Sequence, residues 1–236
     1  MDDQADQGQS DQSQMQAQKR AQMRAQMRLE RIADFVKNRL EETARLYSSE
    51  DHDPATRWEH ILRVAQYGVQ LARAEGADVE TAVAACLLHD VAHFEPMADH
   101  KNHGRIGALI ARRILLELDY PAEQVEDICY AIAVHVDGKA GYEHAETMEG
   151  KIVSDADNIE RFGVFRILMF CAPEMGDSGA MVEKLRKRVA RLEEYLAPSP
   201  LETASGRALL AKQLTRQIRF YKDLIAEWEL TSLPRL

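Results

Sequence analysis

The stretch AACLLHDVAHF, residues 84–94, places an imidazole beside a carboxylate at the end of an apolar run. The apolar residues before the pair are typical of a buried helix, and His89 and Asp90 follow where that helix is expected to end. Imidazole nitrogen and carboxylate oxygen together hold borderline divalent ions such as Zn, Mn, Fe and Ni. Neighbouring helical residues point about 100° apart, so both reach one ion only if it lies near the helix end. In the alternative interpretation His89 caps the helix and Asp90 begins a turn.

Helical spacing of apolar residues continues on both sides of this stretch. Strand-like alternation is absent apart from short ambiguous pieces, and clusters of turn residues separate the helical segments. No internal repeat or flexible linker divides residues 29–236, so we expect one compact all-α domain there. Helices are expected at residues 29–40, 61–71, 79–88, 106–118, 125–134, 152–169, 182–196 and 209–228.

Residues 1–28 differ from the rest of the chain. They are rich in Gln, Asp, Ser, Ala and Met, and they contain the tetrads AQKR, AQMR and AQMR at residues 17–28. So little apolar surface does not offset the entropy of ordering, which predicts a mobile tail. An outward extension of the next helix is the alternative, with Met23 and Met27 one turn apart. A basic helix that touches a membrane surface is a third interpretation.

The composition excludes several classes of protein. The chain has 236 residues, a formal net charge of −9 and three cysteines. The acidic balance argues against a stable nucleic-acid partner. The scattered cysteines lack CxxC spacing, which indicates reduced thiols. No apolar run approaches the roughly 20 residues that span a bilayer, and we find no secretion signal. We expect a cytoplasmic protein without a membrane span and leave homo-oligomerisation open.

The histidines are clustered, since all eight fall between positions 52 and 144. His60 lies in the helical pattern WEHILRVAQYG, and Asp155 and Asp157 lie in KIVSDADNIERFG after an apolar approach. Taken singly, a helical histidine is more often a surface or hydrogen-bonded group than a ligand. Paired aspartates near a helix start usually cap it. The clustering nevertheless favours one shared site.

The order His60, then His89–Asp90, then Asp157 on successive helical blocks resembles the HD-domain superfamily of metal-dependent phosphohydrolases. Supporting matches are HILRV after the first histidine, LLHDVAHF, and VSDADNIERFG. The resemblance spans roughly residues 50–170. The later stretch at 201–228 also looks like the C-terminal helix of small stand-alone bacterial and archaeal HD proteins. The resemblance therefore predicts that residues 29–236 form a single HD domain.

The resemblance implies a set of metal ligands. Four positions match the core motif, and two further histidines match those that members with two metals add between the HD pair and the last aspartate. His103 would open one helix and His135 would close another; the alternatives are a solvated histidine and a helix cap. Asp155 is expected to be a cap or to orient a ligand histidine. The implied ligands are His60, His89, Asp90, Asp157, His103 and His135.

Two departures from the family concern substrate contacts. Relatives often carry DADRLD where this chain has DADNIE, so an arginine that would touch phosphate is shifted or lost. Arg161 is expected to substitute for it. The stretch DHDPATRW is longer than the relatives' approach to the first histidine, which places His52 and Asp53 outside the expected metal shell.

The predicted chemistry follows from the ligands. One or two divalent ions (Mn, Ni, Co, Zn, Mg or Fe) would lower the pKa of bound water and neutralise charge on a phosphoryl group. Asp90 would bridge two ions or take a proton from the attacking water. Loop residues would protonate a leaving oxygen or grip phosphate, with Lys139 in DGKAGY preferred; the alternative for each is a solvated charge. These residues are His93, Lys101, Arg105 and Lys139.

We therefore expect a phosphohydrolase, of the phosphomonoesterase or phosphodiesterase class, for a nucleotide or another small phosphorylated metabolite. A di-iron oxygenase with the same six ligands is one alternative, and it would require iron and consume oxygen. A catalytically weak regulatory module that binds metal or nucleotide is the other. The complete ligand set argues against this last class.

Overall fold

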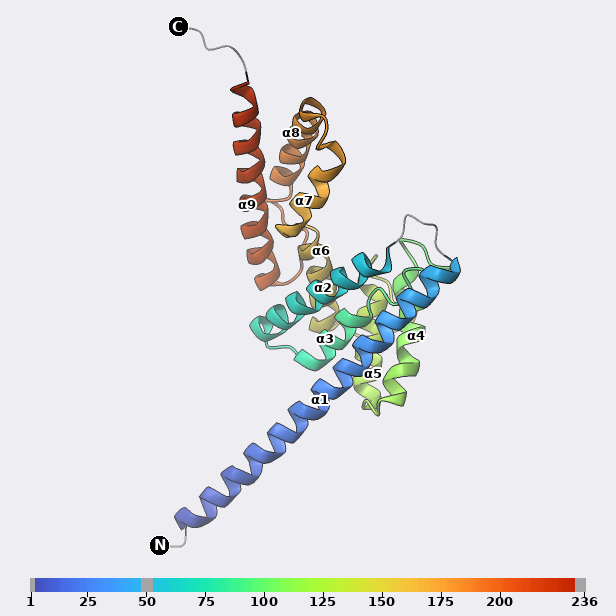
Figure 1. The fold of residues 1–236 in the computed structure, drawn as a ribbon. Coiled ribbons are helices and arrows are strands. Elements are labelled where there is room, and N and C mark those ends of the chain that lie inside the picture. The colour runs from blue at the N-terminus through green and yellow to red at the C-terminus, as the bar shows by residue number, and fades with distance from the viewer. Residues whose placement is uncertain (1–2, 48–52, 232–236) are drawn as a thin grey trace.

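The computed structural model describes residues 3–47 and 53–231, and every regular element within them is a helix (Figure 1). The all-α prediction is thus confirmed. In chain order the helices are α1 (Asp3–Tyr47), α2 (Pro54–Glu75), α3 (Val79–Leu88), α4 (His103–Glu117), α5 (Ala122–Val134), α6 (Met148–Glu160), α7 (Phe165–Cys171), the short 3₁₀ helix η1 (Ala172–Glu174), α8 (Ser178–Glu194) and α9 (Ala204–Glu229).

Helix α3 is the centre of the fold. Its residues from Thr81 to Leu88 are all buried, because α1, α2, α5 and α6 all contact it. A helix that is apolar on every side is stable only when it is enclosed in this way. The apolar run that precedes His89 therefore forms the core, and its C-terminal end delivers the His–Asp pair.

Two glycines allow the helices near that end to approach closely. A Cβ on Gly68 of α2 would lie 2.6 Å from the Sγ atom of Cys86 on α3. A Cβ on Gly104, the second residue of α4, would lie 2.8 Å from the carbonyl oxygen of Ile132 on α5. Neither approach leaves room for a side chain. The first brings α2 against α3, and the second brings the start of α4 against the end of α5.

The prediction of one continuous helix at 152–169 is wrong, because residues 161–164 separate α6 from α7. The carbonyl oxygens of Phe162 and Gly163 accept hydrogen bonds of 2.6 and 3.1 Å from Nε2 of Gln217 on α9. Amides on both sides of this junction make shorter-range turn bonds, such as Gly163 N to Glu160 O. The chain changes direction there, and α7 returns beside α2.

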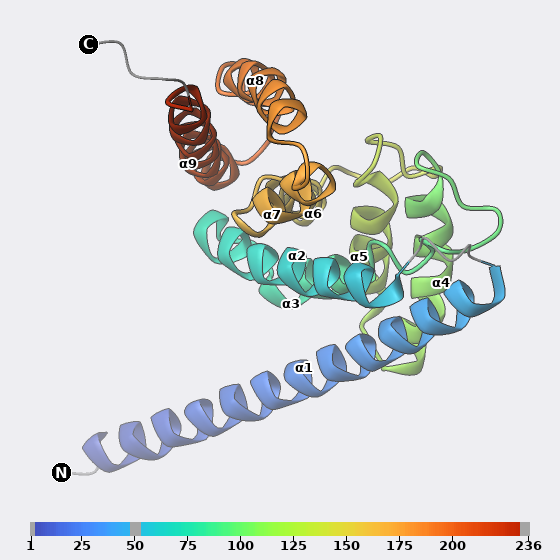
Figure 2. The same cartoon turned by 45° about the horizontal axis from the view of Figure 1, so that its top comes forward.

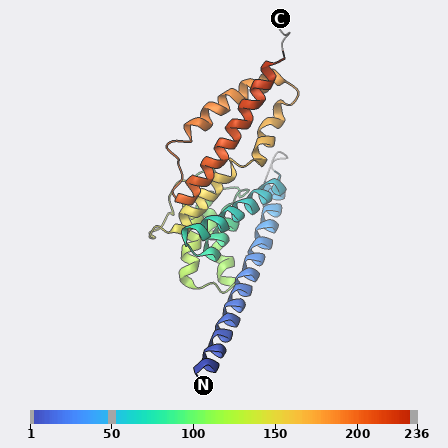
Figure 3. The ribbon, with the colours of Figure 1, turned by 90° about the vertical axis from the view of Figure 1, so that its left-hand side faces the viewer.

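Helices α8 and α9 form an antiparallel hairpin at one end of the molecule, with α7 beside it (Figures 1 and 3). Asp155 of α6 fixes the start of α9. Its carboxylate accepts hydrogen bonds from the backbone amides of Glu202 and Thr203 and from the Thr203 hydroxyl, at 3.0, 2.8 and 2.6 Å. The clusters of turn residues at 94–104, 119–123, 136–146 and 197–200 lie between helices or at their ends, as the sequence predicts. The cluster at 51–54 includes Pro54, where α2 begins, and residues 51 and 52 lie outside the described part.

The N-terminal half of α1 projects from the body (Figure 2). Residues 12–24 are exposed, whereas Ile32, Val36 and Leu40 are buried. Arg28 marks the transition, since it pairs with Glu80 and lies over the ring of Tyr120. Of the two main interpretations of the tetrads, the structure has the outward helical extension. Among the described residues, no helix combines the length and apolar character needed to cross a membrane.

Candidate metal centre

Three helices bring together the first group of candidate ligands. His60 comes from the middle of α2, His89 and Asp90 directly follow α3, and Asp157 lies on α6. All four are buried, with at most 5% of each residue exposed. Nε2 of His60 lies 3.2 Å from Oδ1 of Asp157 and 3.6 Å from Oδ2 of Asp90. Nε2 of His89 lies 3.4 Å from the same Asp90 oxygen and 4.0 Å from the same Asp157 oxygen.

A second group of donors lies on the other side of Asp90. His103 opens α4 and His135 follows α5, as the sequence pattern predicts. Their Nε2 atoms are 3.2 Å apart, and Nε2 of His103 lies 3.1 Å from Oδ1 of Asp90. The His135 and His89 rings meet edge to face with centroids 5.0 Å apart. Asp90 thus faces the first group through Oδ2 and the second group through Oδ1.

All four imidazoles use Nδ1 for a structural hydrogen bond, and in three of them the acceptor, a backbone carbonyl, fixes where the proton lies. Nδ1 of His60 faces a carboxylate oxygen, Oε2 of Glu160, at 2.9 Å and, at 3.3 Å, Nη2 of Arg166, which donates to the same oxygen. A carbonyl oxygen can only accept, so Nδ1 must carry the hydrogen. In a neutral ring Nε2 then has a free lone pair. The three carbonyl contacts are His89 to Cys86 at 2.7 Å, His103 to Asp99 at 2.9 Å and His135 to Ile132 at 2.6 Å.

Nε2 of His60 and Nε2 of His89 face carboxylate oxygens, which also only accept. Within the described part of the chain, Nε2 of His60 and Nε2 of His89 are buried without a hydrogen-bond partner. Buried acceptors that converge without a donor are unfavourable unless a cation lies between them. Two triads bring their ligand atoms within 4.8 Å of one another and share His89: His60–His89–Asp157 and His89–Asp90–His135. The donor set therefore fits a divalent ion.

The charge states of Asp90 and His135 suit a cation. Burial would raise the pKa of Asp90, but His89, His103 and Arg57 outweigh it and hold that pKa well below its usual range. Burial and the nearby His89 lower the pKa of His135 to about 4, so this ring is neutral near pH 7. Neutral imidazole and ionised carboxylate are the forms that bind metals. Burial would lower the pKa of His60 and His103, but the neighbouring carboxylates outweigh it and raise both, so a cation would displace protons from these two rings.

The two carboxylates also bind arginines at the edge of the site. Nη1 of Arg57 donates to Oδ2 of Asp90 at 2.8 Å, and Nη2 of Arg161 donates to Oδ2 of Asp157 at 2.9 Å. The two oxygens of Asp157 therefore have different partners: Oδ1 faces the histidines and Oδ2 faces Arg161. Burial would raise the pKa of Asp157, but His60, His89 and Arg161 outweigh it and hold that pKa below its usual range. Arg161, which the sequence analysis expects to contact phosphate, thus lies at the edge of the cluster.

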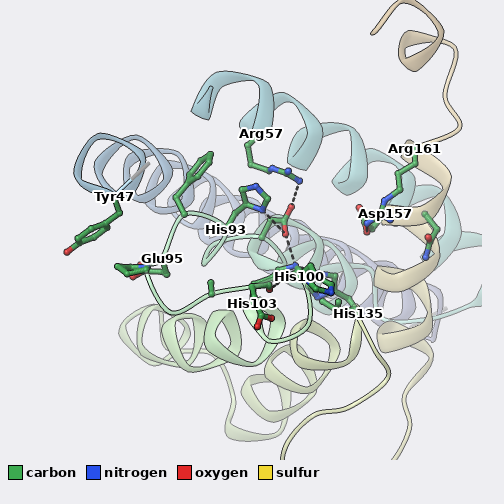
Figure 4. A pocket seen from close by; sticks show the side chains of 16 residues that line it. Tyr47, Arg57, His93, Glu95, His100, His103, His135, Asp157 and Arg161 are labelled. Atoms are coloured by element: carbon green, nitrogen blue, oxygen red, sulfur yellow. Dashed lines mark hydrogen bonds and ion pairs between the residues drawn. The ribbon is translucent and has the colours of Figure 1, made fainter. Parts of the chain in front are cut away.

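A cavity of about 810 Å³ opens onto this cluster, within the range of ordinary ligand pockets. Figure 4 shows Asp157 and Arg161 at one end of it and Tyr47 and Glu95 at the other, with the histidines between them. The lining residues are Tyr47, Arg57, Asp90, His93, Phe94, Glu95, Pro96, Ala98, Asp99, His100, His103, His135, Val136, Asp157, Asn158 and Arg161.

The remaining expected residues divide into two groups. His93 lines the cavity, and burial lowers its pKa to about 4. Lys101, Arg105 and Lys139 are not among the lining residues. Arg105 instead donates to Asp137 and to the carbonyl oxygens of Lys101 and Lys139, so it ties two loops together.

Among the described residues, Asp155 binds the start of α9 and not a histidine, and the carboxylate that contacts a candidate ligand ring is Glu160 instead. Glu160 and Arg57 both contact candidate ligands, and sequence reasoning missed them. Each had a faint signal: Arg57 precedes His60 by three residues, and Glu160 follows Asp157 by three, so each shares a helix face with a candidate ligand. Asp53, which the sequence placed outside the metal shell, caps α2, and His52 lies outside the described residues.

Comparisons with known proteins were made for the sequence and for the fold. The model of the HD domain family matches residues 57–161, the segment that contains all six candidate ligands. No curated protein matches the sequence.

Three solved structures resemble the whole fold. One is an HD-superfamily hydrolase from Bacillus thuringiensis, with 21% identity, 87% of this chain and 98% of that chain covered, and a TM-score of 0.63. Another is a predicted HD superfamily hydrolase from an uncultured Thermotogales bacterium, with 23% identity, coverages of 82% and 91%, and a TM-score of 0.58. The third is Bacillus subtilis YpgQ in complex with ADP, with 20% identity, coverages of 86% and 96%, and a TM-score of 0.58. At such identities the likeness concerns the fold.

Proposed function

The chain contains an HD domain, and from that premise we propose that it is a metal-dependent phosphohydrolase for a nucleotide or another small phosphorylated metabolite. One observation carries the proposal: the Nε2 atoms of His60 and His89 are buried without a hydrogen-bond partner, and they converge with the oxygens of Asp90 and Asp157 at the base of a ligand-sized cavity. When bound there, a divalent ion lowers the pKa of water and neutralises charge on a phosphoryl oxygen. ADP in the similar YpgQ structure supports a nucleotide as the substrate class.

The proposed ligands form two sets that share Asp90. His60, His89, Asp157 and Oδ2 of Asp90 would hold one ion. His103, His135 and Oδ1 of Asp90 would hold a second. Asp90 has one oxygen towards each set, so it would contribute to both and could take a proton from the attacking water.

Substrate binding would depend on the arginines at the cavity rather than on the loop lysines. Arg57 and Arg161 line the cavity and already bind carboxylate oxygens, which, like phosphate oxygens, are anionic hydrogen-bond acceptors that suit a guanidinium group. Arg161 has 62% of its side chain exposed, so it can exchange Asp157 for a phosphate oxygen without unfolding its helix. His93, which lies beside Arg57 in the cavity (Figure 4), would donate a ring N–H to the bound phosphate.

The test is metal analysis of the purified protein, followed by a phosphoesterase screen against a nucleotide panel with Mn, Ni, Co, Zn, Mg and Fe. We expect release of phosphate that is abolished by a chelator and restored by one of these metals. Metal-independent turnover, or the absence of turnover with every metal, would contradict the proposal. Oxygen consumption with iron alone would favour the di-iron oxygenase.

A further inference from the structure

The four candidate ligand histidines are oriented in two different ways, and the difference follows from where they lie on their helices. His89 and His135 directly follow helices, where the carbonyls of the last turn have no helical partner. Each ring binds the carbonyl three residues before it, Cys86 and Ile132 respectively. His103 likewise uses the local carbonyl of Asp99.

His60 has no such local acceptor. It lies in the middle of α2, where the backbone carbonyls are already bonded within the helix. Its Nδ1 atom bonds instead to Oε2 of Glu160 on α6, 100 residues away in the sequence. Among the four rings, this is the one whose orientation depends on a charged side chain.

The carboxylate of Glu160 is held in place by hydrogen bonds from two arginines. It is 2% exposed, and Nε of Arg63 donates to its Oε1 atom at 2.8 Å. Arg166 of α7 donates to Oε2 twice, from Nη2 at 2.6 Å and from Nε at 3.0 Å. The two guanidinium groups keep the carboxylate ionised and prevent its rotation. The break between α6 and α7 is what turns Arg166 back towards Glu160.

We propose that Glu160 is a positioning residue for the metal centre: it fixes the tautomer and ring orientation of His60 and makes Nε2 a stronger ligand. A carboxylate that accepts the Nδ1 hydrogen of a ligand imidazole raises the electron density at the other nitrogen. Arg63 and Arg166 hold Glu160 in register. This inference rests on the proposed metal site and adds a residue to it that does not touch the ion or the substrate.

The test measures metal affinity in the full-length protein after treatment with a chelator, by calorimetric titration with Mn²⁺. Glu160→Gln keeps the size of the side chain but removes its charge. It should raise the Kd for Mn²⁺ by about 10–100-fold, the usual effect of removing such a partner. Glu59→Gln is the matched control, because Glu59 pairs with the same Arg63 from the exposed surface at 3.6 Å and does not touch His60. Its Kd should equal that of the wild type.

Denaturant unfolding of the metal-free variants separates positioning from simple destabilisation. A higher Kd at an unchanged unfolding free energy supports positioning. If Glu160→Gln fails to fold, Arg63→Gln is the second variant, because Arg63 is partly exposed and donates to Oε1 of Glu160, the oxygen that faces away from His60. It should raise the Kd by a smaller factor.

His60→Ala distinguishes an error about the role of Glu160 from an error about the metal site itself. If His60→Ala loses Mn²⁺ binding while Glu160→Gln and Arg63→Gln bind as the wild type does, the role of Glu160 is wrong and the metal site stands. If the wild type itself does not bind Mn²⁺ or any other divalent ion tested, the metal site and this inference both fail.

Discussion

At the level of individual residues, the four candidate ligand rings share one feature: each uses Nδ1 for a hydrogen bond and turns Nε2 towards the cluster. A neutral imidazole has one hydrogen, and in each ring a carbonyl or carboxylate oxygen lies where it would accept a hydrogen bond from Nδ1. Nε2 is therefore the only atom of each ring that can bind a cation. The site is preorganised by contacts that do not involve the ion.

The two buried aspartates of α6 should behave differently when replaced. Asp157→Ala removes a proposed ligand, so bound metal per chain should fall sharply with little change in the stability of the metal-free protein. Asp155→Ala leaves the amides of Glu202 and Thr203 without acceptors, each costing about 1–3 kcal/mol. Its metal content should be retained while its unfolding free energy falls. Elemental analysis and urea unfolding would measure both, and metal loss in Asp155→Ala would reverse the assignment.

The number of ions can be tested at the second set of ligands. With Asp90 shared, we expect two ions per chain in the wild type, about 3.5–4 Å apart as in other two-metal hydrolytic sites. Replacing His103 or His135 by Ala should leave one ion. His144→Ala is a suitable control, since His144 binds Asp127 and the Ala145 carbonyl outside the cluster. A wild type that binds one ion, unchanged in both variants, would make His103 and His135 substrate contacts instead.

At the level of helices, the site depends on close packing near helix ends. Gly104 allows α4 to begin against the last turn of α5, which places His103 beside His135. Gly68 performs the equivalent role between α2 and α3. The carbonyls at the end of a helix orient the rings of His89 and His135. The close contact of α4 with α5 then places His103 beside His135.

Gly104→Ala should therefore disturb both stability and metal binding. The added Cβ would lie 2.8 Å from a backbone oxygen, so the helices must separate, at a cost of about 1–3 kcal/mol. Gly179→Ala is the matched control, because Gly179 is also the second residue of its helix and its added Cβ makes an ordinary 3.5 Å contact. Thermal unfolding with and without metal would report the effect. Equal melting temperatures for the two variants would show that α4 and α5 adjust freely.

For the whole molecule, the active body and the projecting helix are separable. The body encloses α3, the α8–α9 hairpin is tied to it through Asp155, and the first half of α1 extends away from both (Figure 3). The exposed residues 12–24 share no core contact with the body. Nothing in the packing of the site requires them.

Deleting residues 1–24 should change neither the melting temperature nor the metal content, because the packed part of α1 begins near Arg28. Deleting residues 1–40 is the contrasting variant. It removes the fully buried Ile32, Val36 and Leu40, and each large apolar side chain lost from a core costs about 2–5 kcal/mol. The longer truncation should therefore unfold, as circular dichroism and thermal melting would show. A large loss of stability in the shorter one would reveal a role for the tetrads in packing or oligomerisation.

The sequence by itself determined the features that depend on local periodicity. The apolar run before His89 identifies a buried helix, and turn clusters place His89, His103 and His135 at helix ends. The order of motifs identified the HD domain, which the family match confirms. These features were accessible because helix formation and helix ends are set by residues within a few turns of one another.

Only the tertiary structure decided which distant side chains meet. The contact of His60 with Glu160 spans 100 residues, and that of Arg57 with Asp90 spans 33. The same holds for Arg105, which binds Asp137 and loop carbonyls instead of facing the cavity. It also holds for Gln217, which donates to the Phe162 carbonyl at the break between α6 and α7, where periodicity alone predicts a continuous helix. The physical reason is that a charge or a hydrogen-bonding group has no sequence signal for its partner. Its partner is set by how the helices pack.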